Sequence, residues 1–186
     1  MPAKKSAPSR AAWSRMKLFA MDVDGVLTDG TVLISSDGTE AKRFSILDGL
    51  GLALLRHTGF PLAWISGRAS RATAARATEL KIPHLIQGRI DKLTALTELA
   101  TKLGLTLDQC VYMGDDVIDV PALRAAGIGV SVPGAIAEAR AAADYVTRRP
   151  AGLGAVREVC DHLFAARAVK TVGGALRPDS GTTGNR

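Results

Sequence analysis

The sequence predicts an α/β protein with a doubly wound parallel β-sheet, and three observations support this prediction. Short apolar segments alternate with helix-like segments from residue 17 onwards. The strand-like segments are continuously apolar, as expected when helices cover both faces of a sheet. Several of them end in polar clusters, which is where open α/β sheets bind their ligands.

The length and composition fit one globular domain. The chain has 186 residues, of which 47% are hydrophobic and 23% charged, as is usual for a domain with a single core. We expect this domain to span residues 16–170. Residues 1–15, rich in Ala, Ser, Pro and basic residues, are expected to form a disordered basic tail, and residues 171–186 a flexible C-terminal tail.

The positive charge lies mostly at the two ends of the chain. Of the net charge of +6, the first 17 residues carry +5 and the last 20 carry +3, so the intervening chain carries −2. The body therefore lacks the basic face of a nucleic-acid-binding protein, and we expect no nucleic-acid partner. We expect the two basic tails to increase solubility. The alternative is that one tail reaches a neighbouring subunit.

The cysteines and the N-terminus indicate a cytoplasmic protein. The spacing of Cys110 and Cys160 matches no metal or redox motif, so we expect two buried thiols in a reducing compartment. The N-terminal segment lacks the apolar core of a signal peptide. No apolar run is long enough to cross a bilayer, so no membrane partner is expected.

Turn residues and apolar runs divide the chain into elements. We expect a first strand at 17–21 and a β-hairpin at 31–44 around Asp37-Gly38, placed to act as a flap over the residues that follow the first strand. Asp48 is expected to cap the first long helix. The predicted helices are 48–58, which is this first long helix, 69–80, 90–103, a short helix ending near 126, 134–142 and 153–169. The other predicted strands are 61–65, 84–86, 110–113, 128–130 and 145–146.

Two carboxylates follow the first strand. Asp22 and Asp24 are two positions apart, so both can point the same way from the strand end. Adjacent buried carboxylates are unfavourable unless a cation neutralises them, and oxygen ligands suit Mg²⁺. An Asp-rich turn, with Gly25 at positive φ, explains this segment equally well by itself.

Three more polar clusters follow predicted strands: Ser66-Gly67-Arg68, the segment 88–92 that ends in Lys92, and Gly114-Asp115-Asp116. We expect all four clusters to meet at one edge of the sheet. Each is weak evidence alone, because Ser66 also suits a helix cap and Lys92 a solvated helix face. The acidic cluster, which includes Asp119, is more specific because close carboxylates repel.

Such an edge suits the hydrolysis of a phosphate ester. Asp22 can attack phosphorus to give an aspartyl-phosphate, and Asp24 can protonate the leaving alcohol and then activate water. Mg²⁺ held by Asp22, Asp115 and the main-chain carbonyl of Asp24 would screen the repulsion between the anions.

The remaining residues of the clusters have supporting roles in this prediction. Ser66, with nearby backbone N–H groups, can contact phosphate oxygens. Lys92 supplies positive charge to the transferring phosphoryl group. Asp116 is expected to form an ion pair with Lys92, and Asp119 to support the metal shell.

This ordered set resembles the four motifs of the haloacid dehalogenase (HAD) superfamily of phosphatases. The resemblance covers about residues 16–168 and is greatest to the 3-deoxy-D-manno-octulosonate 8-phosphate (KDO 8-phosphate) phosphatases. Segments 44–51, 143–147 and 154–161 are also similar to that family. The resemblance implies a Mg²⁺-dependent phosphatase without a cap domain, in a homotetramer whose neighbouring subunit closes the site.

The absence of a cap domain is also visible in the spacing of the clusters. No insertion large enough for a cap separates Asp29 from Ser66, or Ser66 from Lys92. An open site would admit water and large substrates, so closure by a neighbouring subunit is physically reasonable.

The resemblance also implies a set of substrate contacts, in which Arg68 and Arg76 suit a sugar-acid carboxylate. The predicted contacts are Ser45, Ile46, Leu47, Asp48, Gly49, Ser66, Gly67, Arg68, Arg76 and Lys92. Leu47, Ala53 and Leu153 stand where the family often has arginine. A sialic acid or KDN 9-phosphate therefore remains an alternative substrate. A non-catalytic HAD-fold subunit is a second alternative, which loss of Asp22 or Asp24 would have favoured.

Overall fold

The structure, a computed structural model, describes residues 7–167 and contains the predicted parallel sheet. Six strands lie in the order β5-β4-β1-β6-β7-β8, and every neighbouring pair is parallel. They are β1 (Leu18–Met21), β4 (Leu62–Ser66), β5 (His84–Gln87), β6 (Cys110–Met113), β7 (Ile128–Ser131) and β8 (Tyr145–Val146). The fold prediction is confirmed.

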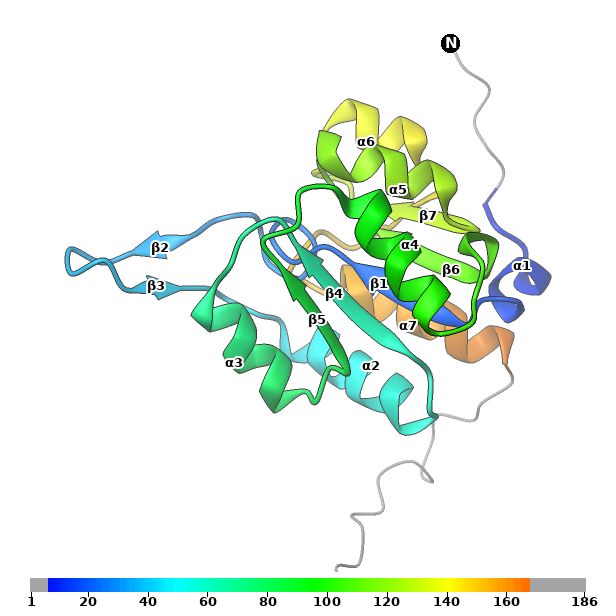
Figure 1. Ribbon diagram of the computed structural model, residues 1–186, viewed down its shortest axis with the longest axis horizontal. Coiled ribbons are helices and arrows are strands. Elements are labelled where there is room, and N and C mark those ends of the chain that lie inside the picture. Colours follow the sequence, from blue (N-terminus) through cyan, green and yellow to red (C-terminus); the bar gives the residue numbers. More distant parts are fainter. Residues whose placement is uncertain (1–6, 168–186) are drawn as a thin grey trace, which may run out of the picture.

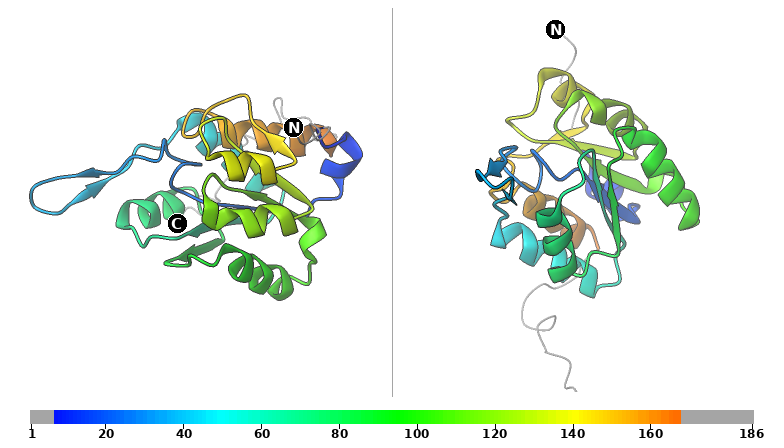
Figure 2. Two further views of the ribbon diagram at one scale, coloured as in Figure 1. Left: turned by 90° about the horizontal axis from the view of Figure 1, so that it is seen from above. Right: turned by 60° about the vertical axis from the view of Figure 1, so that its left-hand side comes forward.

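Helices cover both faces of this sheet (Figures 1 and 2). The helices α2 (Ile46–His57), α3 (Arg71–Glu79) and α7 (Ala155–Ala166) lie on one face, where α2 packs against α7. The helices α4 (Lys92–Lys102), α5 (Val120–Ala125) and α6 (Ala137–Ala142) lie on the other. Short 3₁₀ turns at Leu107–Gln109 and Val117–Asp119 precede β6 and α5.

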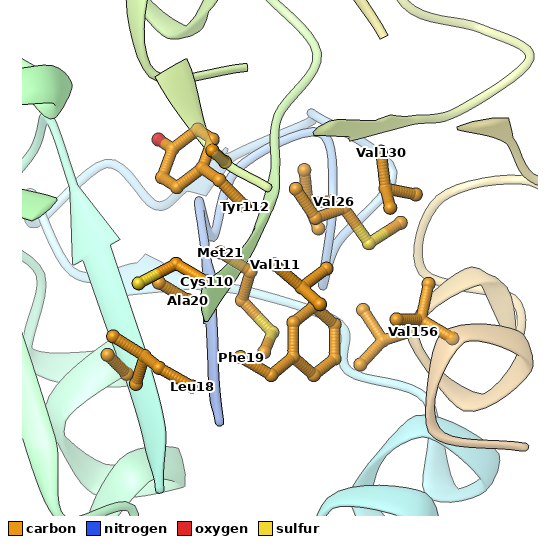
Figure 3. Packing of buried hydrophobic residues seen from close by; sticks show 14 of the residues in the cluster. Leu18, Phe19, Ala20, Met21, Val26, Cys110, Val111, Tyr112, Val130 and Val156 are labelled. Atoms are coloured by element: carbon orange, nitrogen blue, oxygen red, sulfur yellow. The ribbon is translucent and has the colours of Figure 1, made fainter. Parts of the chain in front are cut away.

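The core lies between the sheet and these helices. All four residues of β1 are fully buried, and successive side chains point to opposite faces. Phe19 and Val111 point toward Val156 of α7, whereas Leu18 and Cys110 point to the other side (Figure 3). Cys110 and Cys160 are both buried and unbridged, as predicted.

The segment before the sheet differs from its prediction. Residues Arg10–Ser14 form a helix, α1, capped by the side chain of Ser9. Trp13 is only 3% exposed, and its ring stacks on His162 of α7 with the centroids 5.1 Å apart. The predicted disorder is therefore wrong for this part of 1–15, because a large aromatic side chain finds a partner on α7. The expected tail at 171–186 lies outside the described residues.

The first long helix also begins earlier than predicted. Its N-cap is Ser45, whose hydroxyl accepts hydrogen bonds from the N–H groups of Leu47 and Asp48. Asp48 is not the cap. Its buried carboxylate instead accepts hydrogen bonds from the N–H groups of Gly154 at 3.1 Å and Arg157 at 2.7 Å, and so fixes the start of α7 against α2.

The predicted hairpin is present, with strands β2 (Leu33–Ile34) and β3 (Glu40–Ala41). It extends away from the body of the molecule rather than folding down over the sheet (Figure 1). The side chains of Leu33 and Ile34 are 69% and 64% exposed. Only the base of the hairpin reaches the carboxyl edge of the sheet.

Candidate active site

The predicted clusters meet at the carboxyl edge of the sheet. Asp22 directly follows β1, Lys92 begins α4 after β5, and Asp115 follows β6. Nζ of Lys92 lies 2.8 Å from Oδ1 of Asp22. Carboxylate oxygens of Asp22, Asp115 and Asp119 lie within 4.8 Å of one another. The central expectation of the sequence analysis, one shared edge, is therefore met.

Asp22 and Asp115 border a pocket of about 250 Å³. Its lining residues are Asp22, Asp24, Gly30, Gly67, Arg68, Asp115, Asp116 and Ile118. Asp22 and Asp24 thus face the same space, as predicted, although Asp24 lies in the turn after β1 and not in the strand itself. The lining is strongly acidic, which suits a bound cation rather than a free anion.

Lys92 is completely buried beneath this pocket. Besides Asp22, its ammonium group donates a hydrogen bond to the carbonyl of Ile65 at 2.6 Å, and it lies 3.8 Å from Oδ1 of Asp119. Asp116 has no such contact, because its carboxylate turns back to accept a hydrogen bond from Val117 N–H. The predicted Asp116–Lys92 ion pair is therefore wrong, and Asp22 and Asp119 take that place.

Asp119 holds the loop of residues 114–119 in place. One of its oxygens accepts hydrogen bonds from the N–H groups of Asp115 and Asp116 at 3.0 and 3.1 Å. The other accepts a hydrogen bond from the hydroxyl of Tyr112 at 2.6 Å. Asp119 is fully buried and satisfied by these donors, so it fixes the loop that carries Asp115.

The carboxylates of the acidic cluster are buried and repel one another. Burial, with the nearby charge of Asp119, raises the pKa of Asp22 to about 6, although Lys92 opposes the shift. Burial and the charges of Asp119 and Asp22 raise the pKa of Asp115 to about 7. Oδ1 of Asp115 is buried without a hydrogen-bond partner. Clustered hard oxygen donors, one of them unpartnered, fit a divalent cation such as Mg²⁺.

Gly25 makes this cluster possible. Its φ is +80°, and a Cβ atom placed on it would lie 2.0 Å from Oδ2 of Asp115. Any side chain at this position would therefore displace a carboxylate of the site. The predicted turn at Asp22-Val23-Asp24-Gly25, with Gly25 at positive φ, is confirmed. The same segment also forms part of the acidic site.

Ser66 and its neighbours form a tight loop at the end of β4. The Ser66 hydroxyl donates a hydrogen bond to the carbonyl of Arg68 and accepts one from its N–H group. Ser66 does not line the pocket, whereas Gly67 and Arg68 do. The contact of Ser66 with phosphate stays a prediction.

Most of the predicted sugar contacts lie outside this pocket. The segment Ser45–Gly49 forms the start of α2, and Arg76 packs against it from α3. The guanidinium group of Arg76 forms an ion pair with Glu79 at 2.7 Å and donates to the carbonyl of Ser45 at 3.3 Å. Substrate binding by Ser45–Gly49 and Arg76 stays a prediction. Arg76 packs against the start of α2, whereas the side chains of Ile46 and Leu47 are 76% and 48% exposed.

One buried charged residue at the site was not expected from the sequence. Lys42, just after β3, has a side chain with no exposed surface, and its Nζ lies 2.7 Å from Oδ1 and 2.9 Å from Oδ2 of Asp24. Nothing local distinguishes this lysine from others in an exposed hairpin. Only the observation that the hairpin follows the acidic pair could have suggested it.

Sequence and fold together define a class. A model of the haloacid dehalogenase-like hydrolases matches residues 62–159. KdsC of Escherichia coli (strain B / BL21-DE3), a 3-deoxy-D-manno-octulosonate 8-phosphate phosphatase, is 40% identical over 162 residues, covering 87% of this chain and 86% of that protein. The chain therefore belongs to the haloacid dehalogenase-like hydrolase family, in the branch that contains these phosphatases.

Two solved structures extend the comparison. The Moraxella catarrhalis 3-deoxy-D-manno-octulosonate 8-phosphate phosphatase, in complex with magnesium, phosphate and KDO, is 50% identical and superimposes with a TM-score of 0.83 over 84% of this chain and 90% of its own. The cobalt-bound Haemophilus influenzae enzyme is 35% identical, with a TM-score of 0.81 over 84% of this chain and 92% of its own.

Proposed function

We propose that the protein is a Mg²⁺-dependent phosphomonoesterase that hydrolyses KDO 8-phosphate to KDO and phosphate. The observation that carries the proposal is the buried contact of Lys92 with Asp22, beneath a pocket that Asp22, Asp24 and Asp115 line. The 40–50% identity to KDO 8-phosphate phosphatases over most of the chain supports the substrate. No residue of the acidic set is lost, so nothing favours a non-catalytic subunit.

In the first step, an oxygen of Asp22 attacks phosphorus and the bond from phosphorus to the sugar oxygen breaks. Asp24, in the same pocket, gives its proton to that oxygen, so the sugar leaves as an alcohol. The ammonium group of Lys92 holds Oδ1 of Asp22 and balances the negative charge that gathers around phosphorus.

In the second step, Asp24 takes a proton from water, and the water oxygen attacks the phosphorus of the aspartyl-phosphate. The bond between Asp22 and phosphorus then breaks, which releases inorganic phosphate and restores both carboxyl groups to their starting states. Asp22 thus acts as nucleophile and leaving group, and Asp24 acts first as acid and then as base.

We assign the Mg²⁺ ligands to the Asp22 and Asp115 carboxylates and the main-chain carbonyl of Asp24, with Asp119 as their support. The acidic cluster and the unpartnered oxygen of Asp115 support this assignment. When bound, the cation lowers the repulsion between the anionic nucleophile and the phosphate.

The leucines at family arginine positions bear on substrate choice. Leu47 and Leu153 immediately precede Asp48 and Gly154, which hydrogen-bond to each other. Both leucines are about half exposed. These leucines stand where the family often has arginine, near a contact of α2 with α7. Because the positive charge of those arginines is missing here, a sialic acid or KDN 9-phosphate stays a second candidate substrate.

We further propose a homotetramer in which a neighbouring subunit closes the pocket. The exposed apolar side chains of Leu33, Ile34, Ile46 and Leu153 support an assembly, since burying them would remove apolar surface from water. Within residues 7–167, no helix is both long and apolar enough to cross a membrane. The buried unbridged thiols support a cytoplasmic location.

A panel of sugar phosphates, assayed with Mg²⁺, tests the function. KDO 8-phosphate should give the highest kcat/KM, ahead of sialic acid 9-phosphate, KDN 9-phosphate and hexose phosphates. A higher value for a nine-carbon acid would replace the substrate but not the chemistry. Release of no phosphate from any ester by the Mg²⁺-loaded protein would contradict the proposed function.

A further inference from the structure

We propose that Lys42 is a positioning residue for the acid–base Asp24. The inference rests on the proposed function and adds a residue to its machinery. Lys42 lies just after β3 of the hairpin and outside every cluster of the site.

Lys42 donates a hydrogen bond to Oδ2 of Asp24 and lies within ion-pair distance of Oδ1. Nζ of Lys42 lies 2.7 Å from one carboxylate oxygen of Asp24 and 2.9 Å from the other. A third partner, the hydroxyl of Thr73 on α3, accepts a hydrogen bond at 3.2 Å. The carboxylate is therefore held between the pocket and a fixed cation, rather than rotating freely in the turn that follows β1.

Burial makes this contact more than a surface ion pair. The Lys42 side chain has no exposed surface, whereas the Asp24 side chain is 22% exposed and lines the pocket. A buried ammonium group needs charged or polar partners, and Lys42 finds them in Asp24 and Thr73, with Glu40 3.7 Å away. Removing the ammonium group would leave Asp24 without the charge that orients it.

The hairpin base is fixed at the same place by a second set of contacts. Glu40 of β3 binds the guanidinium group of Arg68 at 2.8 Å and the hydroxyl of Ser70. Because these residues follow β4, the base of the hairpin joins two of the site's loops. The hairpin thereby has a role in the chemistry, which is to place Lys42 against Asp24.

Proton transfer gives this arrangement a measurable consequence. A sugar leaves as an alkoxide unless Asp24 protonates it, whereas p-nitrophenolate leaves readily without a proton. The kcat/KM value reports the steps up to departure of the leaving group. Misplacing Asp24 therefore lowers kcat/KM for the sugar phosphate far more than for p-nitrophenyl phosphate.

The experiment compares Lys42→Met with wild type on both substrates. We expect a loss of about 100-fold in kcat/KM for KDO 8-phosphate and a loss within about fivefold for p-nitrophenyl phosphate, following the usual size of general-acid effects. Lys42→Arg, which keeps a cation, should restore most of the loss. Arg43→Met is the matched control, because Arg43 is the next residue, is exposed and pairs with Asp29 instead.

A double-mutant cycle shows whether Lys42 acts through Asp24. In an Asp24→Asn background, Lys42→Met should cost less than about threefold on either substrate, because the group that it positions is already disabled. A full loss in that background, or equal losses on both substrates in the Asp24 background, would overturn the inference. If Lys42→Met does not fold, Lys42→Gln and Thr73→Val on the same two substrates provide the comparison, with equal losses again overturning it.

The outcome separates this inference from the proposed function. An active wild type whose Lys42 variants keep wild-type kcat/KM on both substrates would remove the role of Lys42 alone. A wild type that hydrolyses neither ester with Mg²⁺ would remove the phosphatase assignment itself.

Discussion

The ammonium nitrogen of Lys92 lies 2.8 Å from Oδ1 of Asp22, although the two residues are separated by four strands and two helices in the chain. Lys92 is completely buried and Asp22 is 6% exposed. A buried ion pair of this kind costs desolvation and adds little net stability by itself. Its position at the edge of the sheet is therefore explained better by chemistry than by folding.

Substitution of Lys92 by Met should abolish phosphatase activity. The buried carboxylate of Asp22 would lose its counter-ion and the phosphoryl group its positive partner, so we expect a loss of at least about 10³-fold in kcat. Phosphate release from KDO 8-phosphate measures it. Lys102→Met, on the last turn of the same helix, is the control and should keep wild-type activity.

Mg²⁺ binding should depend on pH because its ligands must lose protons. The pKa of Asp22 is raised to about 6 and that of Asp115 to about 7, so both carboxylates are largely charged only above about pH 7. We expect the apparent Mg²⁺ affinity to rise steeply between pH 5.5 and pH 7.5, about in step with these pKa values. Titration calorimetry with MgCl₂ measures it, and an affinity that does not change over this range would contradict the assigned ligands.

The same shifts predict how stable the metal-free protein is. A carboxyl group with a raised folded-state pKa binds its proton more tightly in the native state, so its contribution to stability falls as pH rises from about 4 to 7. The EDTA-treated protein should therefore melt at a lower temperature at pH 7.5 than at pH 5.5, and Mg²⁺ should reverse the difference.

The variant Asp115→Asn provides the control for this pH effect. It removes one buried charge, so the metal-free variant should melt at a higher temperature than metal-free wild type at pH 7.5. It should also lose the stabilisation by Mg²⁺. A variant that Mg²⁺ still stabilises as much as it does wild type would show that Asp115 is not a ligand.

The two arginines predicted to bind the substrate should behave differently. Arg68 lines the pocket, so Arg68→Ala should raise KM for a sugar-acid phosphate more than for p-nitrophenyl phosphate. Arg76 packs on Gly49 and Ser45, so Arg76→Ala should mainly lower the free energy of unfolding. Equal KM effects of the two variants on the sugar substrate would show that Arg76 also reaches it.

Asp48 should prove important for stability. Its carboxylate satisfies two N–H groups at the start of α7, so Asp48→Ala should lower the free energy of unfolding by about 1–3 kcal/mol, the usual cost of leaving buried donors unpaired. Urea denaturation measures this change. A fully stable Asp48→Ala variant with a raised KM would instead support the predicted substrate contact.

The strand-end motifs could be predicted from the sequence because each is local. An apolar run that ends in Asp22, Ser66 or Asp115 identifies both the strand and its carboxyl end, and parallel topology brings those ends together. Which aspartate after β6 lies near Lys92 could not be predicted, because Asp116 and Asp119 are only three positions apart. The backbone turn at Val117 decides the matter by directing Asp119 inward.

Contacts between distant elements were the part that the sequence could not reveal. Lys42 reaches Asp24 across the hairpin, Trp13 reaches His162 across the chain, and Asp48 reaches Gly154. None of these pairs produces a periodic pattern, since each depends on how two elements pack. Trp13 was nevertheless evidence against the predicted disorder of residues 1–15, because a tryptophan is unusual in a disordered tail.

The most direct test of the mechanism is to trap the phosphorylated residue. The variant Asp24→Asn, which slows hydrolysis of the intermediate, would be mixed with p-nitrophenyl phosphate and Mg²⁺, quenched in acid and reduced with borohydride, which converts an aspartyl-phosphate to homoserine. Mass spectrometry should then find homoserine at position 22 and at no other aspartate. A full burst of p-nitrophenol with an unmodified Asp22, or with the modification at another residue, would contradict the account.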